Sequence, residues 1–266
     1  MTSGQKAIKY AAIAFAIFLI VNIGIGIVSL LGSTLFIFSD NDDVGDYVEY
    51  TINEQIDSLD IDINAAVIDV QTGDGFALES NCEKLTVEEK NGCLVIEEKS
   101  KKLFRKNKAE VILTIPKGYE FKKVRMVAGA GKVSIYELSA VTMDMNFGAG
   151  EVDIVGLTAG NDIKIEGGVG EVSIDRCELN NAKINMGVGE FNITGKLSGR
   201  SDIDYGVGEA NLNLAGSKDD YTIEMNKGLG ESKIDGNSVK SDIVYGDGEN
   251  YIAIDGGIGE IEVDFY

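Results

Sequence analysis

Hydrophobic and polar residues alternate at period two through most of the chain beyond residue 55. Val172 and Ile174 follow a G-x-G step, and Ile163 and Ile165 precede it, with polar residues between them. Alternation of this kind is typical of strands with one buried and one exposed face. Each unit is therefore predicted to consist of a strand, a glycine turn, a second strand and a polar return.

The G-x-G step recurs eight times, each time followed by a charged residue. The steps begin at Gly129, Gly148, Gly168, Gly187, Gly206, Gly228, Gly246 and Gly257. A period near 20 residues is too short for two-helix repeats and suits one coil of a β-solenoid. Glycine allows a positive φ at the corner without a Cβ clash. The predicted fold class is all-β: a β-solenoid, with coils stacked like a single-stranded β-helix, preceded by one transmembrane helix. The solenoid is expected to cover residues 128–266, with the shortened last repeat closing the C-terminal end.

Residues 48–127 are also rich in strand patterns but lack the regular period. Strands are expected at Leu59–Ile63 and Val111–Ile115, and Asn91-Gly92 is a strong signal for a two-residue hairpin turn. This segment is predicted to cap the N-terminal end of the stack. Residues 39–47 are predicted to be an acidic linker.

The N-terminal segment 10–38 contains no charged residue. About 20 apolar residues span the hydrocarbon core of a bilayer, so one transmembrane helix is predicted there. Two lysines precede the run and three aspartates follow it, which predicts a cytoplasmic tail at residues 1–9 and a body outside the cell membrane. A cleaved signal peptide is the rival interpretation, although its apolar region would be about 7–15 residues long.

The charge of the chain limits the classes of partner and activity. The formal net charge is -20, with 44 acidic and 24 basic residues. Such a surface repels nucleic acid, which is not expected as a partner. The chain has no histidine, the commonest general base and metal ligand. No nucleotide motif is present, so no cofactor is expected and the chain is predicted not to be an enzyme.

The three cysteines allow two interpretations. Cys82 and Cys93 could form a disulfide if their strands are neighbours. Alternatively, these two and Cys177 are small buried hydrophobic residues, which is the commoner case.

The step Ile115–Gly118, followed by G-x-G strands every 19–20 residues, resembles a bacterial family of β-strand-repeat proteins. Its members are generally labelled "putative adhesins" and have no known function. The resemblance covers roughly residues 56–266, and it implies an N-terminal membrane anchor. The shared motifs are structural glycines and alternating strands, so no functional residue can be carried over.

The glutamates that follow the steps are the sharpest candidate site. They are Glu151, Glu171, Glu190, Glu209, Glu231, Glu249 and Glu260. In a regular stack these carboxylates would form a ladder with a spacing of about 4.8 Å. The ladder is a candidate site for weak Ca²⁺ or Mg²⁺ binding, because both ions prefer carboxylate oxygen. A solvated acidic edge is the alternative.

A basic loop is the second candidate site. It contains Lys99, Lys101, Lys102, Arg105, Lys106 and Lys108. Its charge suits contact with lipid headgroups or anionic wall polymers near the anchor. A solvated loop paired with acidic neighbours is the alternative.

These features together predict a membrane-anchored, extracytoplasmic binding or structural module, similar to an adhesin. Its partner would be a protein or a cell-wall polymer. A regulatory protein that senses envelope stress through a membrane partner is the alternative. A carbohydrate-active enzyme is disfavoured, because outward aromatic residues are sparse.

Overall fold

The structure is a computed structural model, and it describes residues 44–52, 55–99 and 109–266. The strands are β1 (Val44–Tyr50), β2 (Ser58–Gly73), β3 (Ala77–Cys82), β4 (Leu85–Lys90), β5 (Cys93–Glu98), β6 (Glu110–Pro116), β7 (Glu120–Asn180), β8 (Ala182–Ser198), β9 (Arg200–Leu214), β10 (Tyr221–Ile234), β11 (Asn237–Ser238), β12 (Ile243–Tyr245) and β13 (Asn250–Phe265). A 3-10 turn at Lys218–Asp220 separates β9 from β10.

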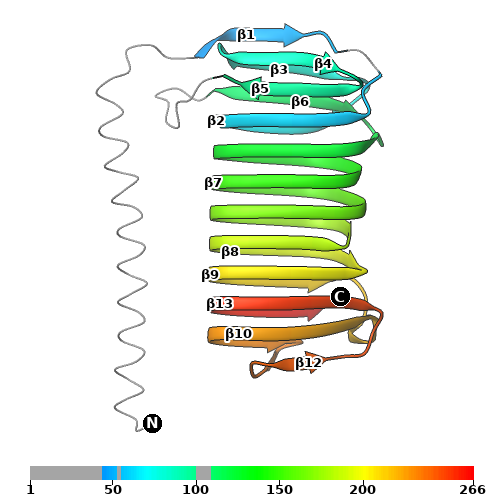
Figure 1. Cartoon of the computed structure of the whole chain (residues 1–266), viewed down its shortest axis with the longest axis vertical. Helices are drawn as coiled ribbons and strands as arrows, with labels where there is room; N and C mark the ends of the chain where they lie inside the picture. Colours follow the sequence, from blue (N-terminus) through cyan, green and yellow to red (C-terminus); the bar gives the residue numbers. More distant parts are fainter. Residues whose placement is uncertain (1–43, 53–54, 100–108) are drawn as a thin grey trace, which may run out of the picture. The chain divides into compact units, whose positions relative to one another are not determined.

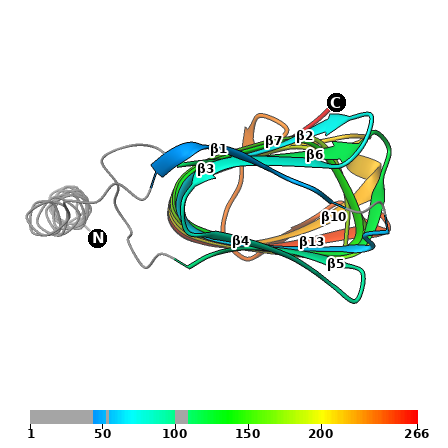
Figure 2. The same cartoon turned by 90° about the horizontal axis from the view of Figure 1, so that it is seen from above.

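The body is a β-solenoid, as the repeats predict. β2, β7, β8, β9, β13 and β10 are hydrogen-bonded in parallel, one coil above the next (Figure 1). β7 alone runs for 61 residues and contains three of the G-x-G steps. Seen along the stack, the coils superimpose into a flattened ring (Figure 2).

The core is built from inward residues that repeat in register. Ile165, Ile184 and Ile203 are neighbours in successive coils, and each is 1% exposed. Burying one such side chain contributes about 1.5–3 kcal/mol. A single coil has no partner for its inner face, so this burial requires the stack.

The N-terminal end begins earlier than predicted. β2 pairs in parallel with the start of β7, from Ser58↔Lys123 to Val70↔Ile135. β2 is therefore the first coil, and it lies within the segment 48–127 that was predicted to cap the stack. This coil was missed because it lacks the G-x-G step: Ala65 and Ala66 lie opposite Ala130 and Gly131 in register.

Shorter strands cover the outer edge of β2. The predicted hairpin is confirmed: β4 and β5 are antiparallel, and Asn91 and Gly92 turn between them with φ of 52° and 77°. β5 and β6 continue the parallel pairing with β2, and β3 and β1 follow in antiparallel order. β1 begins at Val44, so a strand occupies part of the predicted linker 39–47.

The C-terminal end differs from the predicted chain order. β13 lies between β9 and β10, so the last repeat does not close the stack. The end is formed instead by β10, with the short strands β11 and β12 paired to it in antiparallel orientation. Every repeat carries the same pattern, so the pattern alone does not fix which coil follows which.

The predicted fold class needs a correction at its N-terminal element. The described ranges contain strands and one 3-10 turn, and no helix in them is long and apolar enough to cross a membrane. The helix predicted at 10–38, the tail at 1–9 and the linker residues 39–43 lie outside the described residues.

All three cysteines are thiols. Cys82 and Cys177 are buried, and Cys93 is half-buried at the start of β5. Burial raises the pKa of Cys177 to about 12. The structure therefore favours the interpretation of cysteine as a small apolar residue over a Cys82–Cys93 disulfide.

Candidate functional site

The coils approach each other most closely at the G-x-G corner. Gly170 has a φ of +137°, and a Cβ on it would lie 1.9 Å from the carbonyl oxygen of Gly150 in the neighbouring coil. A Cβ on Gly168 would lie 2.2 Å from the carbonyl oxygen of Gly148. The first glycine of the step is thus required by the close approach, and the second by both the approach and its backbone conformation.

The residue between the two glycines is aliphatic in every coil at this corner. In spatial order the residues are Ala130, Ala149, Val169, Val188, Val207, Ile258 and Leu229, and we call them the aliphatic ridge. Val169 is 57% exposed, and Ala149 is exposed as well, while the other five are half-buried. The ridge places one apolar side chain per coil at the surface, over about 29 Å for six intervals of one strand spacing.

The predicted glutamate column runs beside the ridge, but its order and membership differ from the prediction. Glu171, Glu190 and Glu209 are neighbours in register, and Glu260 and then Glu231 follow. Glu249 is not a member. It precedes β13, away from the corner, because its step Gly246-Asp247-Gly248 lies between β12 and β13.

Lysines neutralise part of this column near its ends. Lys132 heads the column, with Nζ 2.5 Å from Glu151 and 2.7 Å from Asp153. Hydrogen bonds with Asp153 and Glu151 raise the pKa of Lys132. At the other end Lys233 lies 2.6 Å from Glu260, and that hydrogen bond raises the pKa of Lys233.

The middle of the column keeps its charge exposed. Glu190 accepts a hydrogen bond of 2.8 Å from Asn192. The side chains of Glu171 and Glu209 are exposed, and neither carboxylate forms an ion pair or hydrogen bond with any described residue. The cation ladder stays a prediction: among the described residues, no group of three or more acidic, Cys or His side chains is arranged to hold a metal ion.

A second polar column follows the other flank of the ridge. Glu166, Asn185, Asp204 and Asp255 are neighbours in register, and they line a shallow depression of about 580 Å³ floored by the corner glycines. At the Glu166 end of this column, the side chain of Asn146 donates a hydrogen bond of 2.7 Å to Glu166. We call the ridge and its two polar columns the corner surface.

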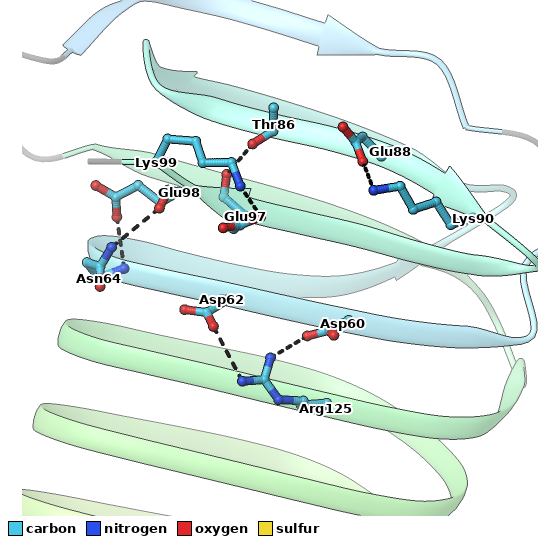
Figure 3. A network of polar contacts seen from close by, with 10 residues as sticks. All are labelled: Asp60, Asp62, Asn64, Thr86, Glu88, Lys90, Glu97, Glu98, Lys99 and Arg125. Atoms are coloured by element: carbon cyan, nitrogen blue, oxygen red, sulfur yellow. Dashed lines mark hydrogen bonds and ion pairs between the residues drawn. The ribbon is translucent and has the colours of Figure 1, made fainter. Parts of the chain in front are cut away.

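Polar contacts also close the first coil (Figure 3). The buried carboxylate of Glu98 accepts hydrogen bonds from the backbone N–H groups of Asn64 and Ala65, at 2.9 and 3.1 Å. These donors stand where the G-x-G step would be in later coils. Arg125 pairs with Asp60 at 2.7 Å and with Asp62 at 3.4 Å, which ties β2 to β7.

The basic loop is mostly beyond what the structure describes. Lys99 forms an ion pair with Glu97 of β5, next to the Glu98 contacts (Figure 3). The other members, Lys101, Lys102, Arg105, Lys106 and Lys108, lie outside the described residues. Contact of this loop with an anionic surface therefore stays a prediction.

The sequence analysis missed the aliphatic ridge, although the signal is present. Seven of the eight steps have Ala, Val, Leu or Ile between the glycines, and only one has a charged residue there, Asp247. That exception is also the step that lies away from the corner. The middle residue of the step would therefore have identified both the ridge and the one step, at Gly246, that does not belong to the corner.

Three solved structures illustrate what the chain is similar to. A "putative adhesin" from Bacteroides fragilis is 17% identical, over 84% of this chain and 97% of that one, with a TM-score of 0.46. A "putative cell adhesion protein" from Clostridium sporogenes is 15% identical, over 83% and 99%, with a TM-score of 0.36. A "putative lipid binding protein" from Parabacteroides distasonis is 14% identical, over 82% and 93%, with a TM-score of 0.38.

No curated protein matches the chain. The family comparison is more informative, because the matched region, residues 56–250, begins just before β2 and ends at the start of β13. That region contains almost all of the coils described above. The chain belongs to the Toastrack DUF4097 family.

Proposed function

We propose that the chain is an extracytoplasmic, adhesin-like binding module that holds its partner along the corner surface. The observation that carries this function is the repetition of one aliphatic and one polar position in every coil, at one strand spacing. A rigid surface with such a repeat suits a partner that is itself extended or repetitive. The partner is a protein or a cell-wall polymer.

Weak contacts can sum to firm attachment on such a surface. One valine of the ridge contributes at most about 1.5 kcal/mol by itself, since that is roughly the value for burying a whole Val side chain. Contacts linked along one rigid body add in avidity without any new type of contact. Carboxylates on both flanks of the ridge favour a cationic or neutral partner and disfavour a polyanion.

The test is adhesion of beads coated with the full chain to intact bacterial cells. The ridge variant carries Val169→Ser and Val207→Ser, and the matched control is Val244→Ser, a valine of β12 that is 67% exposed and lies off the ridge. We expect the ridge variant to lose about tenfold or more in attachment, since about 1.4 kcal/mol is a factor of ten. The control should bind like the natural chain.

Treating the cells with protease separates the two kinds of partner. Attachment that survives the treatment indicates a wall polymer, and attachment that is lost indicates a protein. Equal losses in the ridge variant and the Val244 control would contradict binding through the corner surface. The absence of enzymatic activity, the exclusion of nucleic acid and the regulatory alternative all stay predictions.

A further inference from the structure

The C-terminal coil occupies a slot between two other coils. β13 pairs in parallel with β9 from Tyr251↔Arg200 to Phe265↔Leu214, and with β10 from Asn250↔Tyr221 to Val263↔Ile234. The chain therefore passes from β9 to the outer coil β10 and returns to place β13 between them (Figure 1).

The slot fits β13 through alternating large and small side chains. Ile261 is flanked in register by Ala210 on one side and by Ser232 on the other. The ring of Tyr205 occupies the space beside Gly256, where a Cβ would lie 3.1 Å from the ring and 2.6 Å from Ile261. Large residues of one coil thus fill the space left by small residues of the next, as close-packed interiors require.

Direct pairing of β9 with β10 is the competing arrangement. Both coils carry the same corner step, and both are in register with β13, so Gly208 would meet Gly230 if β13 were absent. That pairing would place Ala210 against Ser232 and leave unfilled the volume that Ile261 now occupies. A cavity of this kind costs stability. Binding of β13 between β9 and β10 is therefore favoured over direct pairing of β9 with β10.

The connection between β10 and β13 allows β13 to leave its own slot. Residues 235–249 contain no buried residue, and within them β11 and β12 pair with β10 over only two and three residues. A segment of this length spans up to about 50 Å when fully extended. It is long enough to carry β13 to a neighbouring molecule.

We propose that β13 is an exchangeable coil, and that the slot between β9 and β10 accepts β13 from a second copy of this chain. The contacts inside the slot are the same whichever copy donates β13, so exchange depends on protein concentration relative to the effective concentration set by the connection. The product is a strand-exchanged dimer. Exchange depends on the coil order alone and not on the function proposed above.

Disulfide trapping between separate chains tests the exchange. One full-length chain carries Asp202→Cys and the other carries Ala253→Cys, both in a Cys93→Ser background. Asp202 and Ala253 are register neighbours on β9 and β13, on the outer face. Neighbouring strands are about 4.8 Å apart, within the Cα separation that a disulfide tolerates. The chains are mixed at high concentration, partly unfolded in urea, refolded and oxidised.

The matched control mixes a Lys183→Cys chain with the Asp202→Cys chain. Lys183 and Asp202 are neighbours on β8 and β9, which do not exchange in the proposed dimer. We expect the β9–β13 mixture to give at least tenfold more disulfide-linked dimer than the control mixture. The yield of that dimer should rise with protein concentration. Equal yields in the two mixtures would overturn exchange of β13. A single chain with both Asp202→Cys and Ala253→Cys must form its disulfide within the monomer, and failure there would overturn the register itself.

Discussion

Removing one carboxylate from the middle of the glutamate column should stabilise the protein. Glu209 is exposed and lies between Glu190 and Glu260 in register, and its carboxylate forms no ion pair with any described residue. Two unit charges about 4.8 Å apart repel by about 0.9 kcal/mol in water without salt. At 0.15 M ionic strength the Debye length is about 8 Å, which reduces each term by roughly half. Glu209→Gln removes one such repulsion in full, with Glu190, and a weaker one with Glu260, which Lys233 partly neutralises. Unfolding should therefore cost about 0.5–1 kcal/mol more.

The assay is urea unfolding of the full chain at low and moderate salt. The matched control is Glu249→Gln, which removes the same charge from a glutamate that follows a G-x-G step but lies outside the column. We expect a gain for Glu209→Gln that shrinks as salt is added, and a much smaller change for the control. Equal effects of the two substitutions, or a loss of stability in Glu209→Gln, would refute the column as a line of repelling charges.

Three further predictions concern the corner, a turn and the cation ladder. Gly170→Ala should lower the free energy of unfolding in urea by about 3 kcal/mol or more, because alanine would combine a φ of +137° with a contact of 1.9 Å to a backbone oxygen. A Cβ on Gly160 would have nothing within 4 Å, so the control Gly160→Ala should change stability by less than about 0.5 kcal/mol. Similar losses in the two variants would contradict the corner geometry. Hydrogen bonds from the backbone N–H and the side chain of Ser217 lower the pKa of Asp220, so this contribution to stability is present above the ordinary carboxyl pKa and is lost as the pH falls through the lowered value. NMR titration should show the Asp220 midpoint rising in Ser217→Ala, and an unchanged midpoint would contradict the assignment. If the column binds Ca²⁺, millimolar Ca²⁺ should raise the thermal midpoint more than NaCl of equal ionic strength, and the difference should vanish when the column glutamates are replaced by glutamine.

Most of the solenoid could be predicted because its strands and corners are determined by residues that are close together in the sequence. Period-two alternation identifies the strands, and the glycine step identifies the corner, where φ is positive and the next coil is too close for a side chain. The Asn91-Gly92 hairpin was predictable for the same reason, since only a few residues adopt that turn.

The features that could not be predicted depend on contacts between residues that are far apart in the sequence. β2 lacks the glycine step, because Glu98 rather than another coil meets the backbone of Asn64 and Ala65 at that end. The position of β13 depends on which inward side chains fit each other, such as Ile261 between Ala210 and Ser232. Identical repeat patterns carry no information on that choice.

The corner surface was predicted only in part. The glutamates were recognisable because charge is conspicuous after a glycine step, and most of them do align in register. The ridge was missed because small aliphatic residues such as Ala149 are ordinarily buried, and only the corner geometry exposes them.

The order of the coils determines the glutamate column, the ridge and the slot, and one pair of double-cysteine variants tests it most directly. Asp202 lies one strand from Ala253 and two strands from Glu224. Two strand spacings are about 9.6 Å, which is beyond the reach of a disulfide. We expect Asp202→Cys/Ala253→Cys to oxidise within the monomer and Asp202→Cys/Glu224→Cys to remain reduced. The reverse result would show that the coils stack in chain order, and it would contradict the structure on which the corner surface and the exchangeable coil depend.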